Sequence, residues 1–179
     1  MLVAKQKRKE NIAEYILYLY QVEELIRAFQ FDMELIDKRL VAAYQVDEKK
    51  LDEIRSWYSN LMLMMEKEGI REKGHLQFLV NLIGDLNEFH ARLLKDGSEK
   101  MYIQQFQLVA GLLVELHQKN KNAANDVQLA LDTIYGFLLL KMKKAEVSTA
   151  TEQAVKSLSQ WLGSLSKIYK AFENGDFTF

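Results

Sequence analysis

Apolar residues recur along most of the chain at alternating spacings of three and four positions. Such spacing keeps one face of an α-helix apolar and suits helices that pack at shallow angles. The pattern predicts helices over residues 6–29, 32–45, 47–68, 72–95, 98–119, 123–144 and 149–173. The first two can also form one long bent helix, because neither Gly nor Pro separates them.

Residues that commonly start or end helices stand near these bounds. Capping side chains are expected at Asn11, Asp47, Ser98 and Thr149, and C-terminal glycines at Gly69, Gly97 and Gly175. The connections between the helices are short, which favours antiparallel neighbours. We therefore predict an all-α fold, a single antiparallel helical bundle of six or seven helices that forms one domain over residues 1–179.

The composition supports this prediction and excludes several kinds of chemistry. The 179 residues are 49% hydrophobic and 27% charged, as in a globular domain, and include neither Pro nor Cys. Without Cys, the chain has no disulfide, no thiolate nucleophile and no Cys-based zinc site. A net charge of −1 argues against a nucleic-acid partner, since nucleic-acid-binding domains are strongly basic.

Neither long apolar stretch has the features of a signal peptide or a membrane span. Glu14 interrupts the first stretch, and no Ala-x-Ala-like cleavage site follows it. The stretch over residues 127–140 contains Asp132 and is shorter than the ~20 residues that span a bilayer. We therefore expect a cytoplasmic protein with no membrane partner.

The chain has three histidines, His75, His90 and His117, and none lies in a recognisable metal-binding or catalytic motif. A di-metal site in a helical bundle needs Glu three residues before His, whereas Glu88 and Glu115 precede the nearest His by two. Glu-x-x-Glu pairs, His-Asp pairs and Gly-rich phosphate-binding motifs are also missing. The sequence predicts no catalytic residue, metal or cofactor, and a metal-dependent hydrolase is only the third hypothesis.

Four glycines lie near the middles of the predicted helices, at Gly84, Gly111, Gly136 and Gly163. Each destabilises a helix by about 1 kcal/mol relative to Ala, so their presence needs an explanation. One interpretation is a close approach of helix backbones, and the other is space for a ligand in the core. In the second case, the expected ligand-binding residues are His90, Asn87, His117, Gly84 and Gly111. The two histidines either pack separately, each with one hydrogen-bond partner, or meet in the core.

The N-terminal segment has two features that suit a protein partner. A basic cluster over residues 5–9 is either a solvated tail or a contact for an acidic partner surface. Residues 12–20 are apolar or aromatic around most of the helix, which places this helix at the centre of the bundle or in a dimer interface. The expected interaction surface consists of Lys7, Arg8, Tyr15, Tyr18, Glu24 and Arg27.

The run KQKRKENIAEYILYLYQVEELIRAFQFD, over residues 5–32, resembles the opening of an uncharacterised bacterial family of the Bacteroidetes lineage, a domain of unknown function. The most specific part of the resemblance is KRKENIAEYIL, followed by Glu-Leu-Ile-Arg at residues 24–27. The resemblance extends over the whole chain. It implies an all-helical soluble protein, and it implies no activity, substrate or catalytic residue.

These observations favour a non-enzymatic protein-interaction or self-associating module, which forms a homodimer or binds a protein partner through its N-terminal aromatic helix. The alternative is a bundle that binds a small ligand in a core pocket near the mid-helix glycines and His90.

Overall fold

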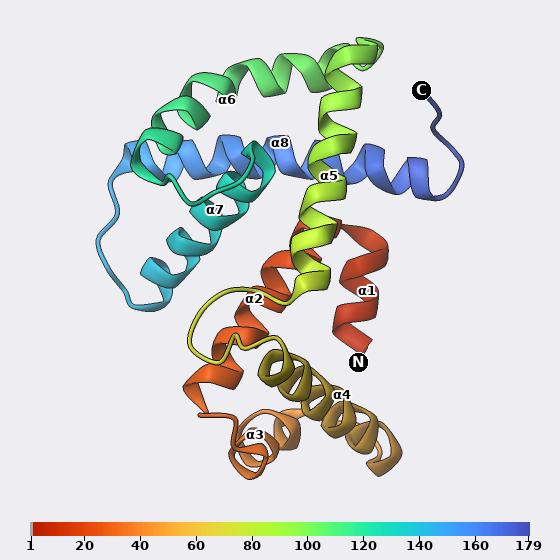
Figure 1. Cartoon of the computed structure of the whole chain (residues 1–179), viewed down its shortest axis with the longest axis vertical. Coiled ribbons are helices and arrows are strands. Elements are labelled where there is room, and N and C mark those ends of the chain that lie inside the picture. The colour runs from red at the N-terminus through yellow and green to blue at the C-terminus, as the bar shows by residue number, and fades with distance from the viewer. Residues whose placement is uncertain (1) are drawn as a thin grey trace.

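The computed structural model describes residues 2–179, and of Leu2 only the backbone; Met1, where the predicted domain begins, lies outside the described residues. These residues form eight α-helices and one short 3-10 helix, with no strand among them (Figure 1). The prediction of an all-α fold is therefore confirmed. The elements are α1 Leu2–Glu10, α2 Ile12–Ala28, α3 Met33–Arg39, η1 Val41–Ala43, α4 Glu48–Lys67, α5 Gln77–Asp96, α6 Lys100–Lys119, α7 Asp126–Met142 and α8 Thr149–Glu173.

The helix count exceeds the predicted six or seven because Asn11 divides the first expected helix. Its backbone is extended, with φ −152° and ψ 108°, and this conformation cannot continue a helix. Its side chain accepts a hydrogen bond from the backbone N–H of Glu14 at 3.1 Å, as predicted for a cap. The sequence pattern predicts this cap but places the preceding residues in the same helix.

The basic lead-in forms helix α1, in which Lys7 and Arg8 have partners in the same chain while Lys5 and Lys9 are exposed. Helix α1 packs against α2. The guanidinium of Arg8 donates two hydrogen bonds to the carboxylate of Glu173, at 2.6 and 2.8 Å, near the end of α8. The acidic surface expected on a partner molecule is, for this arginine, the C-terminal helix of the same chain.

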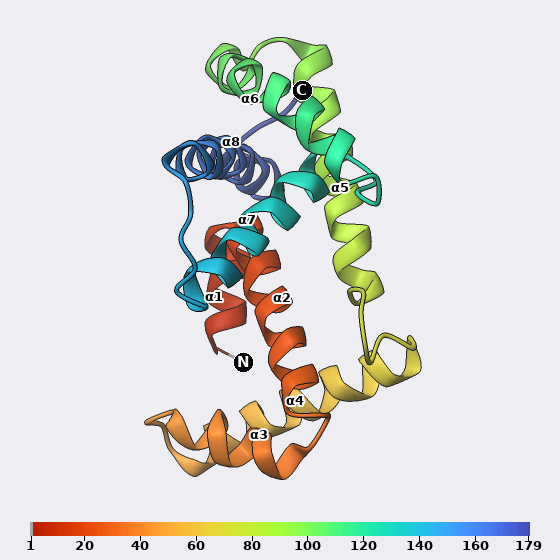
Figure 2. The ribbon, with the colours of Figure 1, turned by 90° about the vertical axis from the view of Figure 1, so that its left-hand side faces the viewer.

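Helix α2 connects two parts of the molecule. Helices α3 and α4 pack together at the lower end of Figure 1, and α5 to α8 form the upper part. Helix α8 packs against α2, α5, α6 and α7. Both ribbon views show α8 crossing α5 steeply, so these helices do not all run up and down one axis (Figure 2).

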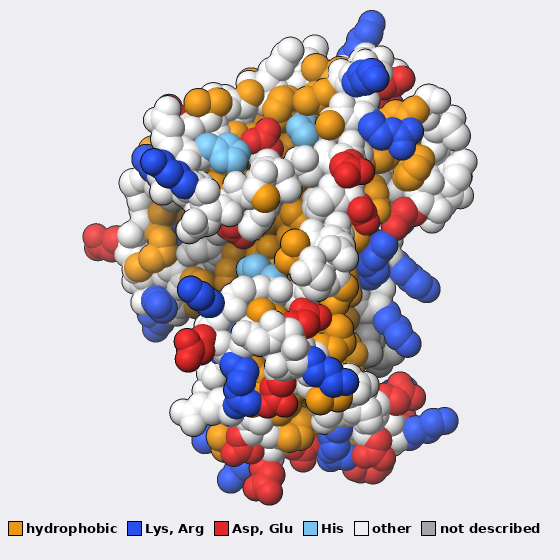
Figure 3. Space-filling model, in the orientation of Figure 1, with side chains coloured by type: hydrophobic (Ala, Val, Ile, Leu, Met, Phe, Trp, Pro, Cys, Tyr) orange, Lys and Arg blue, Asp and Glu red, His pale blue; other side chains and the backbone are white. Residues whose placement is uncertain are grey.

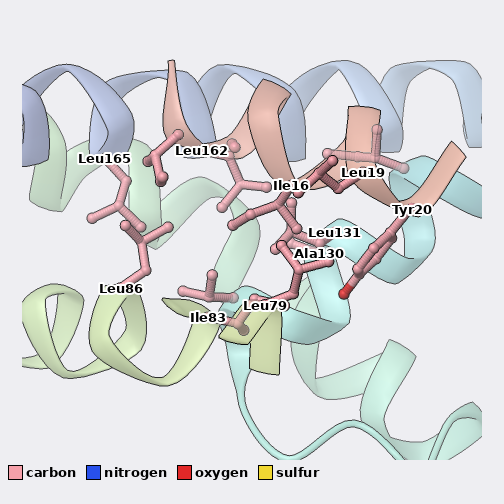
Figure 4. Packing of buried hydrophobic residues seen from close by; sticks show 14 of the residues in the cluster. Ile16, Leu19, Tyr20, Leu79, Ile83, Leu86, Ala130, Leu131, Leu162 and Leu165 are labelled. Carbon is pink, nitrogen blue, oxygen red and sulfur yellow. The ribbon is translucent and has the colours of Figure 1, made fainter. Parts of the chain in front are cut away.

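The core lies where α2, α5, α7 and α8 meet. In Figure 4, Ile16 and Leu19 of α2 face Leu131 of α7 and Leu162 of α8, with residues of α5 on the opposite side. All four of these side chains are at most 2% exposed. Burying a side chain of this size contributes about 1.5–3 kcal/mol, so this junction is a main source of stability.

Two helix bounds differ clearly from prediction: α3 ends at Arg39 and not near residue 45, and α5 begins at Gln77 and not near residue 72. Gly74 has φ +95°, which is incompatible with a right-handed helix. The carbonyl groups of Ile70 and Gly74 accept hydrogen bonds from Arg27 of α2. Because distant side chains bind the backbone of this segment, its local helical preference is overridden.

Most of the other predictions about where helices begin and end are confirmed. Asp47 caps α4, and Gly97 follows α5 with φ +76°. The cap of α8 is Ser148 and not Thr149, and the residue before α6 is Glu99 and not Ser98. Each of these two errors is a shift of one position, which a capping pattern alone does not resolve.

The four mid-helix glycines are not points of close backbone approach. A Cβ atom built on Gly84, Gly111, Gly136 or Gly163 meets no heavy atom within 4 Å outside its own local helix. The interpretation as a pinch in the bundle is therefore wrong. No described helix is both long and apolar enough to cross a membrane.

The open space at Gly111, which is solvent-exposed, predicts a stabilising substitution. We expect Gly111→Ala to raise the free energy of unfolding by about 1 kcal/mol, because Ala restricts the unfolded chain and favours the helix. Gly97→Ala is the matched control and should lower it by about 1 kcal/mol, since Gly97 has a left-handed backbone. Urea denaturation measures both, and a destabilised Gly111→Ala variant would contradict the structure.

Candidate functional site

The outer face of α2, beside α7, carries two adjoining hollows. One, of about 210 Å³, is lined by Lys7, Glu14, Leu17, Tyr18, Gln21 and Leu138. The other, of about 370 Å³, is lined by Leu17, Gln21, Tyr135, Leu138, Lys141 and Met142. Because they share Leu17, Gln21 and Leu138, we treat them as one surface and call it the α2–α7 face.

The α2–α7 face is apolar because α7 has more apolar residues than one packed face can bury. Its inward positions, such as Leu131, are fully buried. Its last turns still expose 42% of Leu138, 44% of Leu140 and 65% of Met142. A helix that is apolar all round is normally covered on all sides, and this one is covered on only some of them.

Charges of both signs border the α2–α7 face. Lys7 and Glu14 form an ion pair at 3.0 Å across the α1–α2 junction. Lys141 pairs with Glu152 at the other end of the face. The border is therefore close to neutral, and long-range repulsion does not oppose the approach of a similar surface.

The structure does not bring all six expected interaction residues together. Lys7 and Tyr18 line the same hollow. Tyr15 is half-buried; burial raises the pKa of its hydroxyl, and the charge of Arg8, which is bound to α8, opposes this change. Glu24 and Arg27 form an ion pair at 2.7 Å at the far end of α2. Only the first pair thus belongs to the α2–α7 face.

A buried polar cluster that sequence analysis missed lies on the inner side of α2. The carboxylate of Glu23, which is 1% exposed, accepts a hydrogen bond from Nδ1 of His75 at 2.6 Å. Its other oxygen accepts from the backbone N–H of Leu76 at 2.8 Å. Leu76 is the N-cap residue of α5, so the carboxylate also lies at the positive end of that helix dipole.

Arg27 completes the attachment of this loop to α2. Its side chain is 10% exposed and donates to the carbonyl oxygen of Ile70 at 3.1 and 3.3 Å, and to that of Gly74. Glu23 and Arg27, one turn apart on α2, therefore each bond to the same loop. We call the contacts of Glu23 and Arg27 with residues 70–76 the α2 clamp.

Aromatic rings and a second carboxyl group surround the α2 clamp. The ring of Tyr20 stacks on that of His75, with centroids 3.6 Å apart. Tyr20 Oη is buried and has no hydrogen-bond partner in the described structure, while the hydroxyl of Tyr135 donates to the carbonyl oxygen of Tyr20 at 3.4 Å. Burial raises the pKa of Asp132, and the charge of nearby His75 opposes this change.

The α2 clamp supports a structural role better than a chemical one. Both oxygens of Glu23 and the Nδ1 atom of His75 already have partners within the fold. Among the described residues, no group of three His, Asp or Glu side chains is arranged to hold a metal ion. One signal was present in the sequence, because Glu23 lies in phase with the apolar positions Ile16, Leu19 and Ile26.

The expected ligand-binding histidines have separate partners. His90 is 4% exposed, and its Nδ1 lies 2.5 Å from the hydroxyl oxygen of Tyr102. That oxygen accepts the indole N–H of Trp161 at 3.1 Å, so the Tyr102 hydroxyl joins His90 of α5 to Trp161 of α8. His117 instead contacts Asp126, at 3.1 Å. The structure thus agrees with the interpretation in which His90 and His117 each have their own partner, and it shows no hydrogen bond between the two histidines among the described residues.

Asn87, Gly84 and Gly111 are not arranged around an enclosed site with these histidines. Asn87 and Gly84 are half-buried on α5, whereas Gly111 is exposed on α6. Histidine side chains are visible on the face shown in Figure 3, among apolar and acidic groups. The main hollows of the described structure are lined by none of these five residues, so they give the predicted core pocket no support.

The chain matches one known protein family over nearly its whole length. The family described as "Domain of unknown function (DUF4924)" matches residues 1–176. The chain belongs to the DUF4924 family. No curated protein and no solved structure matches the chain.

The α2 clamp predicts unequal effects for two adjacent glutamates of this DUF4924 chain. Glu23→Ala should lower the free energy of unfolding by about 3–5 kcal/mol, because it leaves His75 and the start of α5 without their buried acceptor. Glu24→Ala, the matched control, removes an exposed carboxylate and should cost less than about 1 kcal/mol. Equal losses in urea denaturation would show that Glu23 has no special role.

The buried His90 predicts a dependence of stability on pH. Burial lowers the pKa of His90, whereas the unfolded value is about 6.5. Between the two pKa values the unfolded DUF4924 chain binds more protons, so this stabilisation is complete above about pH 6.5 and declines as pH falls. The difference in unfolding free energy between wild type and His90→Gln should therefore shrink from about pH 8 to about pH 5. A constant difference would mean that His90 does not contribute in this way.

Proposed function

We propose that this DUF4924 protein is a non-enzymatic protein-interaction module that forms a homodimer through its α2–α7 face. We also propose that the protein acts in the cytoplasm of a bacterium of the Bacteroidetes lineage. The observation that carries it is the position of Leu138 and Met142. Both side chains project from α7 and are strongly exposed, directly beside hollows that they help to line.

A second copy of the chain is the partner that fits this arrangement. A two-fold interface joins identical patches, so each patch must present both the projecting and the receiving surface. On the α2–α7 face, Leu138 and Met142 project, while Leu17, Gln21 and Tyr135 line the space next to them. The border has Lys7 and Glu14 of opposite sign, and the net charge of −1 produces little repulsion between copies.

The remaining surfaces of α2 argue for the same conclusion. Its inner face is occupied by the core and by the α2 clamp, in which the polar groups already have partners. Tyr18 lies at the outer face and lines both the smaller hollow of the α2–α7 face and a neighbouring one beside Tyr44 and Tyr58. The aromatic helix highlighted by the sequence therefore has an apolar outer side available for a partner.

Replacing exposed apolar residues tests this proposal by a change of oligomeric state. Leu138→Lys combined with Met142→Lys should weaken the dimer roughly 30-fold or more, because a charged group then enters a desolvated contact. Leu108→Lys is the matched control: Leu108 is 81% exposed on α6 and should not affect the dimer. Analytical ultracentrifugation across the micromolar range measures each dissociation constant.

Two outcomes would contradict the proposed dimer. One is a wild-type protein that remains monomeric throughout the micromolar range. The other is loss of the dimer in Leu108→Lys with no loss in the α7 double variant, which would move the interface to α6. Circular dichroism of each variant establishes that the fold is retained.

A further inference from the structure

A hollow of about 330 Å³ lies between α6 and α8, apart from the α2–α7 face. Helix α6 contributes Tyr102 and Gln105, and α8 contributes Lys167 and Ile168. The segment after α8, which leads to the C-terminus marked in Figure 1, contributes Asp176 and Phe177 to the lining. The volume lies at the lower end of the range for small-molecule sites.

The segment after α8 is held in place by the fold. The backbone N–H groups of Asp176 and Phe177 both donate to the carbonyl oxygen of Ala171, at 2.8 and 3.2 Å. The ring of Phe177 contacts Phe89 of α5 edge to face, with centroids 6.2 Å apart. The C-terminal wall of the hollow is therefore a packed feature of this structure.

One polar atom at the hollow lacks a partner. The side-chain oxygen Oε1 of Gln105 is buried and accepts no hydrogen bond in the described structure. A buried acceptor without a donor costs about 1–3 kcal/mol, so most such atoms are paired. If the side-chain amide of Gln105 rotates toward the hollow, an N–H group of a bound ligand can donate to Oε1.

The charged groups of the hollow favour a positive ligand group. Glu99 and Asp176 contribute two carboxylates, against the single ammonium of Lys167. Neither carboxylate takes part in a salt bridge among the described residues. The apolar and aromatic part of the lining, which includes Ile168 and Phe177, suits the hydrocarbon body of the same ligand.

We propose that the α6–α8 hollow binds a small primary amine with an apolar body. The ammonium group is recognised by the amide oxygen of Gln105 and the carboxylates of Glu99 and Asp176. The apolar body packs against Ile168 and Phe177. Lys167 provides a counter-charge for a ligand that also has a carboxylate, so this ligand class includes both simple amines and amino acids.

Calorimetric titration with three related probes tests this inference. Phenethylamine has the amine and the apolar body, phenylalanine adds a carboxylate, and phenylacetate has the carboxylate without the amine. We expect binding of phenethylamine, of phenylalanine, or of both, and at least tenfold weaker binding of phenylacetate. If phenylalanine binds more strongly than phenethylamine and this advantage is lost in Lys167→Gln, the ligand is an amino acid. If the two compounds bind equally, the ligand is a simple amine.

A pair of glutamine variants connects the binding to the hollow. Gln105→Leu removes the unpaired acceptor and should weaken amine binding at least tenfold, while Gln104→Leu, the exposed neighbour, should leave it unchanged. If Gln105→Leu does not fold, Asp176→Asn replaces it, because Asp176 is exposed after α8. Preferential binding of phenylacetate, no binding of either amine, or full binding by the folded hollow variants would overturn the proposal. None of these results depends on the oligomeric state.

Discussion

The buried carboxylate of Glu23 joins α2 to the start of α5, and the arrangement of the upper helices depends on it. A buried charge is unfavourable by several kcal/mol unless hydrogen bonds and opposite charge compensate it. Here the compensation comes from His75, from the N–H of Leu76 and from the α5 dipole. Arg27 donates to the carbonyl groups of Ile70 and Gly74 in the same loop. These bonds fix the path of the loop from α4 and therefore the direction in which α5 begins.

The α2 clamp also decides which surfaces are left for partners. With its inner side bound to the core and the loop, α2 turns Leu17, Tyr18 and Gln21 outward beside α7. Helix α7 in turn exposes Leu138 and Met142, because its inner positions are already occupied by the core. The α6–α8 hollow arises independently, from the packing of the last helix and the segment that follows it.

The parts of the structure that were predicted correctly are those set by near neighbours along the chain. The apolar spacing located the helices, and Asn11 and Asp47 cap the helices that follow them. Predictions about contacts between distant residues were less successful. The four glycines lie in open space, and Arg8 binds Glu173, which is 165 residues away. A local pattern has no information about which helix will lie opposite a given side chain.

The sequence by itself determined an all-helical chain, because helix formation depends on residues three and four positions apart. It also determined that α7 would have more apolar surface than one face can bury. Only the tertiary structure decided that Glu23 meets His75, 52 positions away, and that Gln105 is buried without a donor. Such contacts result from helix crossing angles and loop paths, which are settled by the packing of the whole core and not by any single segment.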